Sequence, residues 1–218
     1  MPLGPALLDA LKLLALAAMT VDHVNAALFA RSIEQLTLIG RIAFPVLVFA
    51  AASGALRTRS PRRYLRRLLL CALVSQPVFW LALDTQWWHL NTVFTLLLGV
   101  GAVLAWRADR PEWLALLLPP ALLVDYGLAG VAAVPAAAML LADAPLRRCA
   151  GAVLFAVVSP WLWFGPWQLT VGLATSAAAL LLLARTNRQR PPAGPRYAFY
   201  VYYPLHLALL ALVKRLAM

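Results

Sequence analysis

The feature that most constrains this chain is a series of apolar runs, most of them long enough to cross a lipid bilayer. A bilayer core about 30 Å thick is spanned by about 20 apolar residues of α-helix. The runs predict an all-α integral membrane protein, a polytopic bundle of about nine transmembrane helices in a single domain, 1–218. The expected spans are 6–29, 34–56, 65–83, 91–107, 112–125, 128–142, 147–160, 165–184 and 197–216.

The composition and charge agree with a membrane chain. Hydrophobic residues make up 63% of the sequence and charged residues 12%, which is about half the charged fraction of a soluble domain. A formal net charge of +11 would also suit a nucleic-acid binder. The arginines, however, fall in short clusters between the apolar runs, which is typical of membrane topology. We therefore expect lipid contact, no nucleic-acid partner, and a multi-pass protein of the bacterial inner (cytoplasmic) membrane.

The arginine clusters orient the bundle. They follow the even-numbered spans, whereas the loops after odd-numbered spans carry Arg31 alone. Because cytoplasmic loops are enriched in Lys and Arg, the N-terminus is predicted to be cytoplasmic. The first run, 6–29, lacks the basic start of a signal peptide and is expected to remain as a membrane helix. The clustered residues are Arg57, Arg59, Arg62, Arg63, Arg66 and Arg67, then Arg107 and Arg110, then Arg147 and Arg148, then Arg185, Arg188, Arg190 and Arg196.

The fifth and sixth spans, 112–125 and 128–142, leave two alternatives open. They are short, Pro119 and Pro120 interrupt the first of them, and Asp125 stands at the break between the two. They are either full crossings or half-helices that enter and leave on one side, an arrangement that membranes tolerate where backbone is buried in protein.

Asp22 and Arg41 are charged residues inside apolar spans. Counted from the turn near residue 32, each lies about 14 Å below the outer surface at 1.5 Å per helical residue. An isolated charge at that depth costs several kcal/mol, so a partner is expected. The matching depths predict an Asp22–Arg41 ion pair. Pro45 cannot donate a hydrogen bond to the Arg41 carbonyl, so the segment GRIAFP is expected either to expose that carbonyl or simply to kink.

Two histidines reach the same depth from opposite ends of the sequence. His23 follows Asp22 on the first span, below a sparse polar stripe that includes Lys12. His206 lies on the last span, on one helical face with Tyr203. An ionisable side chain at this depth indicates function more often than structure. The alternative is a histidine hydrogen-bonded within the bundle.

Further polar residues stand at span ends and in the second loop. His89, Asn91 and Asp125 lie at the outer ends, where Asp125 serves either as a helix cap or as part of a site. The cluster RTRSPRRYLRR is either topogenic, touching anionic lipid, or a clamp for the phosphates of a soluble cofactor. Cys71 and Cys149 form no metal-ligand spacing, and no metal is expected.

Six segments in order give the sequence a resemblance to a known family. They are LKLLALAAMTVDHVN (11–25), LIGRIAFPVLVFAAASG (38–54), RRYLRRLLLCALVSQPVF (62–79), LNTVFTLLLGV (90–100), DYGLAG (125–130) and YVYYPLHLALL (200–210). The set resembles the TraX family of integral membrane proteins, named for the pilin N-acetylase of conjugative plasmids. More remotely it is similar to transmembrane acyltransferases that use acyl-CoA, such as the acyltransferase-3 proteins. Residues 143–196 match least well.

The resemblance implies an N-acetyltransferase that moves acetyl from cytosolic acetyl-CoA to a peptide or other amine acceptor, such as a pilin N-terminus. His23 is then expected to be the base, because burial favours neutral imidazole. Arg41 would stabilise the oxyanion, and Asp22 would hold Arg41. The remaining expected contacts are Tyr203, His206, Asn91 and Asp125 for the substrates, and Arg63, Arg66, Arg67 and Lys12 for CoA.

Two other functions compete with the acetyltransferase. A proton-coupled transporter or flippase would use the same buried charges as a relay, but we find no internal repeat of the kind common in transporters. A non-catalytic membrane assembly factor would use the charges for helix packing alone. Acetyl-CoA binding separates the enzyme from the transporter, and a silent His23→Ala would favour the assembly factor.

Overall fold

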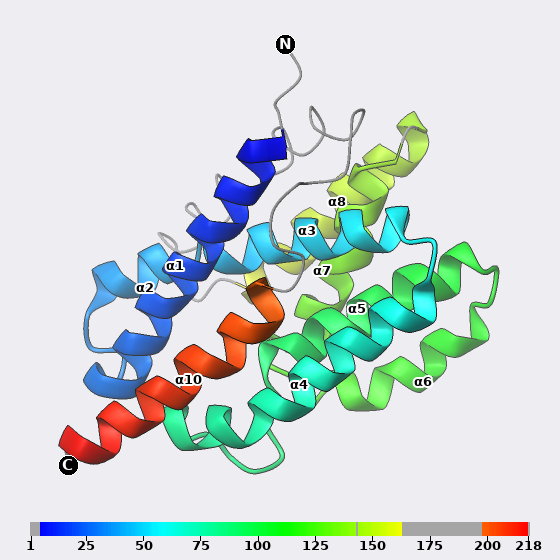
Figure 1. The fold of residues 1–218 in the computed structure, drawn as a ribbon. Helices are drawn as coiled ribbons and strands as arrows, with labels where there is room; N and C mark the ends of the chain where they lie inside the picture. The colour runs from blue at the N-terminus through cyan, green and yellow to red at the C-terminus, as the bar shows by residue number, and fades with distance from the viewer. Residues whose placement is uncertain (1–4, 143, 163–197, 218) are drawn as a thin grey trace.

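The computed structural model describes residues 5–142, 144–162 and 198–217, which form α-helices joined by short loops (Figure 1). The expected span 165–184 lies outside these ranges. Within them no strand is present, apart from an isolated bridge between Leu90 and Val124. The helices are α1 (Pro5–Phe29), α2 (Glu34–Gly40), α3 (Ala43–Arg57), α4 (Pro61–Leu83), α5 (Thr92–Arg107), α6 (Glu112–Ala121), α7 (Gly127–Leu140), α8 (Pro145–Leu162) and α10 (Ala198–Ala217).

Three of the described segments are long and apolar enough to cross a bilayer. They are Lys12–Phe29, Glu34–Arg57 and Pro61–Leu83, and Thr92–Arg107 and Gly127–Leu140 are shorter apolar helices. Their outward faces are apolar as well, as with Leu70, Leu73 and Val74 on α4. The all-helical, membrane-protein part of the prediction is confirmed. The count of about nine crossings and the cytoplasmic N-terminus stay predictions.

The expected span 34–56 is divided in two. Helix α2 ends at Gly40, Arg41 and Ile42 form a turn, and α3 begins at Ala43. Pro45 explains the division, because its ring nitrogen cannot bond to the Arg41 carbonyl one turn earlier. The GRIAFP segment is therefore a break between two helices, and Arg41 at this break lines the large cavity described below.

The fifth expected span is much shorter than a bilayer is thick. Helix α6 has 10 residues, Glu112–Ala121, and is therefore about 15 Å long at 1.5 Å per residue. Pro119 and Pro120 occupy its last turn, and the chain then turns through Asp125 and the left-handed Tyr126 into α7. Helix α6 alone is too short to cross, which favours the half-helix alternative for this segment.

Small residues let α5 and α7 pack closely at the centre of the bundle. Helix α7 contacts α3, α5 and α8, and its alanines at 133, 136, 137 and 138 are fully buried. Gly99 of α5 faces Val134 so closely that an added Cβ would lie 2.5 Å from Val134 Cγ2. Close backbone approach through small residues is a common way for helices to associate in membranes.

The last helix returns to the first. Helix α10 packs against α4 and α1, and in Figure 1 it runs beside both. Near its end, Lys214 forms an ion pair with Asp84 and donates a hydrogen bond to the Ala82 carbonyl at 3.4 Å. These contacts attach the C-terminal end of α10 to the loop that follows α4.

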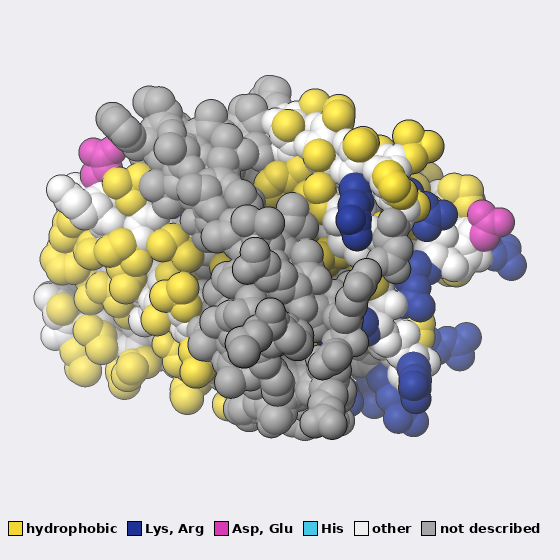
Figure 2. All heavy atoms as spheres, turned by 90° about the horizontal axis from the view of Figure 1, so that it is seen from above, with side chains coloured by type: hydrophobic (Ala, Val, Ile, Leu, Met, Phe, Trp, Pro, Cys, Tyr) yellow, Lys and Arg dark blue, Asp and Glu magenta, His cyan; other side chains and the backbone are white. Residues whose placement is uncertain are grey.

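The two ends of the bundle differ in charge. The turns between α3 and α4 and between α5 and α6 lie together at the right of Figure 1, while the loops after α1 and after α4 lie at the other end. Viewed from above, Lys and Arg side chains gather at that same right-hand end (Figure 2). Arg107 donates to the Ala55 carbonyl there, and Arg147 lies 5.3 Å from the Trp106 ring centre. We call this the arginine-rich end.

Candidate functional site

A cavity of about 770 Å³ opens among the loops opposite the arginine-rich end. Its walls come from α1, the break between α2 and α3, and the loops that follow α1, α4 and α6. Polar and aromatic side chains from all these segments line it, namely Asp22, His23, Arg31, Arg41, Asp84, Thr85, His89, Thr92, Asp125 and Tyr126. We call it the outer cavity.

His23 and His206 form a buried pair beside the outer cavity. His23 Nδ1 lies 2.7 Å from His206 Nε2, and the two ring planes differ by 5°. Each histidine is 6% exposed, and His23 lines the cavity. The equal depths expected from the sequence are therefore matched by lateral contact between the first and last described helices.

The hydrogen bonds of this pair indicate which nitrogens carry protons. His206 Nδ1 lies 3.0 Å from the Tyr202 carbonyl oxygen, which can only accept, so Nδ1 donates. In a neutral imidazole the other nitrogen accepts, and His206 Nε2 therefore receives the proton of His23 Nδ1. This assignment leaves Nε2 of His23 as the basic nitrogen.

Aromatic side chains of α10 hold the histidine pair. Tyr202 OH lies 2.6 Å from Thr20 Oγ1 on α1, which ties the two helices together one turn from His206. The Tyr203 ring packs edge-on against both histidines, with centroids 6.2 Å from His23 and 5.5 Å from His206. Tyr203 is 1% exposed, so it supports the pair from behind and does not line the outer cavity.

Asp22 makes its hydrogen-bonded ion pair with Arg31, in contrast to the expected pair with Arg41. Arg31 Nη1 lies 3.1 Å from Asp22 Oδ1 and 3.3 Å from Oδ2. Arg31 has left-handed backbone (φ 61°) just after α1 ends, which turns its side chain back toward the helix. Arg41 lines the same cavity, so its charge acts on Asp22 across the cavity. Sequence depth alone did not reveal a loop arginine folding inward.

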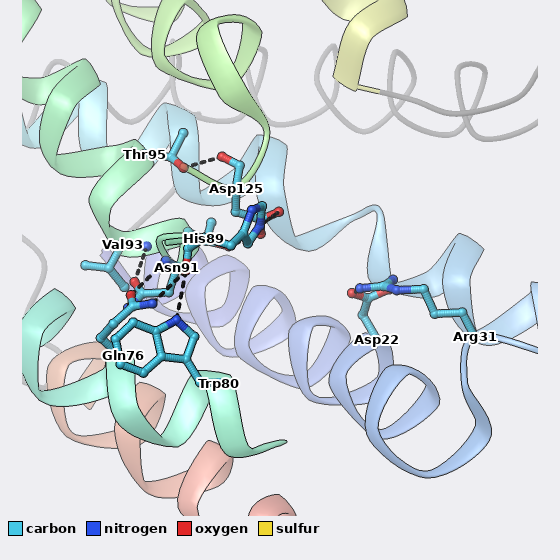
Figure 3. Close-up of polar contacts among 10 residues, drawn as sticks. Asp22, Arg31, Gln76, Trp80, His89, Asn91, Val93, Thr95 and Asp125 are labelled. Carbon is cyan, nitrogen blue, oxygen red and sulfur yellow. Dashed lines mark hydrogen bonds and ion pairs between the residues drawn. The ribbon is translucent and has the colours of Figure 1, made fainter. Parts of the chain in front are cut away.

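A second polar group gathers around Asp125 on the far side of the outer cavity (Figure 3). Thr92 Oγ1 donates to Asp125 Oδ2 at 2.6 Å, and Thr95 donates to the Asp125 carbonyl. His89 Nε2 lies 3.7 Å from Asp125 Oδ1. The backbone fixes this arrangement, because Leu90 N bonds to Leu123 O and Asp125 N bonds to Leu90 O, each at 2.8 Å.

The contact between His89 and Asp125 shifts both groups toward their charged forms. The carboxylate of Asp125 raises the pKa of His89, against a smaller opposing effect of burial. For Asp125, burial favours the protonated acid, but its contacts with His89 and Thr92 together outweigh that effect and lower the pKa. Both groups are therefore charged on the acid side of neutrality. As the pH rises, His89 releases its proton and Asp125 loses its positive partner.

This shift predicts a pH-dependent contribution to stability. Because the pKa of His89 is raised in the folded protein, the pair contributes fully to stability below the histidine pKa of the unfolded chain, about 6.5. That contribution is lost as the pH rises through the pKa of the folded protein. The difference in melting temperature between wild type and His89→Gln, measured in detergent, is expected to be largest near pH 6 and to shrink by about pH 9. Glu112→Gln is the control, because its partner Arg110 forms an exposed ion pair without a histidine. A difference that grows with pH would contradict this expectation.

Asn91 is placed as a structural residue next to this group. It caps α5 by accepting from Val93 N at 3.0 Å, and its amide donates to Ala72 O at 2.9 Å and to Gln76 Oε1 at 2.8 Å. Gln76 and Trp80 in turn donate to the His89 carbonyl, at 2.7 and 3.1 Å. Asn91 is fully buried and lines no part of the outer cavity. Gln76, a polar residue within an apolar span, is the signal that sequence reasoning missed.

The residues expected to bind CoA lie around two further cavities. One of about 340 Å³ at the arginine-rich end is lined by Arg59, Arg63, Arg67 and Tyr64, and exposed Arg66 lies outside that lining. A largely apolar cavity of about 330 Å³ is lined by Lys12, Leu16, Leu47, Tyr64 and Tyr200. Tyr64 is shared by these two cavities, and Leu47 is shared by the apolar cavity and the outer cavity. The three cavities thus follow one another through the bundle.

The described side chains include no cluster of three or more His, Cys, Asp and Glu residues suited to a metal ion. What the outer cavity offers instead is a basic imidazole nitrogen, two guanidinium groups and three carboxylates. Such a set is suited to moving protons and stabilising charge in acid–base chemistry.

Comparison with known proteins places the chain in a family. The family model described as TraX protein matches residues 7–214. The chain belongs to the TraX family. Among TraX-like relatives, it is 28% identical to the probable fimbrial assembly protein FimC, serogroup H1, of Dichelobacter nodosus, across 94% of each protein. It is 27% identical to protein TraX of Escherichia coli, covering 96% of this chain and 88% of that protein. No solved structure matches.

Proposed function

We propose that this TraX-family chain is a multi-pass inner-membrane acetyltransferase that moves an acetyl group from cytosolic acetyl-CoA to an amine acceptor. The observation that carries the proposal is the His23–His206 pair, whose 2.7 Å contact leaves a basic nitrogen on a ring that lines a large cavity. The fimbrial-assembly name of one relative favours a pilin subunit or a similar small protein as the acceptor.

The sequence of cavities supports a route for the donor. The phosphates of CoA would contact Arg59, Arg63 and Arg67, since guanidinium groups suit phosphate oxygens. The pantetheine arm would follow the apolar cavity past Tyr64 and Leu47. Leu47 also lines the outer cavity, so the thioester at the end of the arm would arrive beside His23.

The chemistry is a direct transfer. The amine nitrogen attacks the thioester carbonyl carbon, forming the C–N bond, and the carbonyl oxygen becomes an oxyanion. His23 Nε2 takes the proton that the attacking nitrogen loses, and His206 keeps the ring oriented through Nδ1. The C–S bond then breaks, and the proton passes from His23 to the CoA thiolate. The products are the acetylated amine and CoA.

Arg41 and Arg31 would stabilise the oxyanion. Both line the outer cavity with His23, and donors aimed at a developing negative charge contribute a few kcal/mol to a transition state. Asp22 holds Arg31 in place through the 3.1 Å ion pair. An added Cβ on Gly40 would lie 2.4 Å from Asp22 Cβ, so the glycine provides the space in which Asp22 sits.

The test is acetyl-CoA binding and transfer by the purified protein in nanodiscs. Wild type is expected to bind acetyl-CoA and to move radiolabelled acetyl to a peptide amine. The double variant Arg63→Ala, Arg67→Ala is expected to bind at least about tenfold more weakly, because two phosphate contacts are lost. Arg62→Ala, an exposed arginine outside the cavity lining, is the matched control. Absence of acetyl-CoA binding by wild type would refute the enzyme and favour a transporter or an assembly factor.

A further inference from the structure

The outer cavity contains three carboxylates, and they differ in their partners. Asp22 is paired with Arg31, and Asp84 is paired with Lys214, so fixed cations neutralise both. Asp125 has a histidine as its cationic partner, with 3.7 Å between His89 Nε2 and Asp125 Oδ1. Unlike Arg31 and Lys214, His89 can give up its proton, so Asp125 is the carboxylate in this cavity whose negative charge can become available to a ligand.

We propose that Asp125 and His89 form the recognition and deprotonation site for an acceptor that arrives as an alkylammonium ion from the side opposite the arginine-rich end. This inference rests on the proposed acetyl transfer, and it adds a binding group, a residue for proton removal and a side of entry.

The geometry leaves one carboxylate oxygen for such a ligand. Thr92 occupies Asp125 Oδ2 at 2.6 Å. Oδ1 is farther from His89 than a hydrogen bond allows, so it retains capacity to accept an N–H from an ammonium group. The backbone of His89 is held in this position, because Gln76 and Trp80 both donate to its carbonyl oxygen.

The proton balance requires a second base besides His23. An ammonium ion must lose one proton before its nitrogen can attack, and the nitrogen loses another during acyl transfer. His89 Nε2 takes the first proton, giving a free amine and an imidazolium that Asp125 stabilises. His89 is 39% exposed, so it returns this proton to solvent. An amine of pKa near 8 and an imidazole with a raised pKa are well matched for this exchange.

The location of the pair fixes the side of entry. His89 belongs to the loop after α4, and Asp125 belongs to the loop after α6. The loop after α4 lies away from the arginine-rich end in Figure 1, and two backbone hydrogen bonds join the two loops. Trp87 and Trp88, next to His89, are 73% and 48% exposed at this rim. The acceptor therefore meets the donor without crossing the bundle.

The experiment measures binding first, without turnover. Wild type, Asp125→Asn and Glu34→Gln are purified in nanodiscs and titrated with a short alanine–glycine peptide amide, with a free or an acetylated N-terminus. Glu34→Gln is the matched control, because it removes an exposed carboxylate of α2. Wild type and the control are expected to prefer the free amine by about tenfold, and Asp125→Asn is expected to lose that preference. Equal binding of both peptides by wild type would overturn the ammonium site whether or not the protein acetylates anything.

Turnover then tests His89 and separates the two proposals. His89→Gln is expected to reduce acetylation of the peptide amine at least tenfold, but to alter acetylation of an arylamine, uncharged at neutral pH, by less than about twofold. Equal loss with both amines would overturn the role of His89 in deprotonation. If wild type binds the free-amine peptide selectively but fails to bind acetyl-CoA, the acetyl transfer fails and the ammonium site stands.

Discussion

His23→Gln is expected to lower the rate of acetyl transfer by about 10²- to 10⁴-fold, because it removes the proposed base. Acetyl-CoA affinity is expected to stay within about twofold, since the proposed phosphate contacts lie at the other end of the bundle. Both quantities are measured on one nanodisc preparation, with radiolabelled transfer for the rate and calorimetry for the affinity.

His206→Gln is the informative companion of His23→Gln. It removes the ring whose Nε2 receives the His23 proton, but it leaves the His23 ring, which lines the cavity. A smaller loss of rate than for His23→Gln is expected, as is typical when a positioning group is lost and the base remains. Cys149→Ser, an exposed site on α8, controls for handling. Full transfer by His23→Gln would show that this histidine has a packing role alone.

Gly99→Ala is expected to destabilise the protein strongly for the addition of a single methyl group. The new Cβ would lie 2.5 and 2.6 Å from Val134 side-chain carbons and 2.9 Å from the Val131 carbonyl oxygen. The backbone of α7 cannot rotate away as a side-chain tip can, so the two helices must separate. Overpacking of this kind costs about 1–3 kcal/mol, and the melting temperature in detergent should fall by roughly 5 °C.

Gly101→Ala, two residues further along α5, is the matched control. There the added Cβ meets the Leu117 methyl carbons at 3.6 Å, an ordinary contact. Because alanine favours helix over glycine by up to about 1 kcal/mol, this variant should be unchanged or slightly more stable. Equal destabilisation of both variants would show that α5 does not depend on close approach at Gly99.

Most helices were predictable from the sequence, because the hydrophobic pattern marks them strongly. At Arg41 the sequence predicts only that the carbonyl lacks its helical hydrogen bond. It does not distinguish a bend from an end of the helix, because Pro45 removes that hydrogen bond in both cases. Whether the helix ends there depends on the contacts that replace the missing hydrogen bond. Here Gly40, at the end of α2, packs against Asp22 of α1. That contact joins two helices and has no signature in a single segment.

The candidate site was predictable in depth but not in lateral position. Counting residues along helices brought His23 and His206 to one layer, and their contact confirms that they share it. The residue count could not identify Arg31, because the side chain of a loop residue can point toward the cavity or away from it. The left-handed backbone at Arg31 decides the direction. Nor could the residue count separate Asn91, which is fully buried, from Asp125, which borders the cavity.

The histidine pair joins residues 183 positions apart, from the first and the last helices described here. During synthesis the first histidine enters the bilayer long before the last helix leaves the ribosome. Until that final helix docks against α1 and α4, His23 lacks its contact with His206. If His23 is the base of the proposed reaction, its orientation is therefore completed only when the last helix has been inserted, and full activity has to wait for that step.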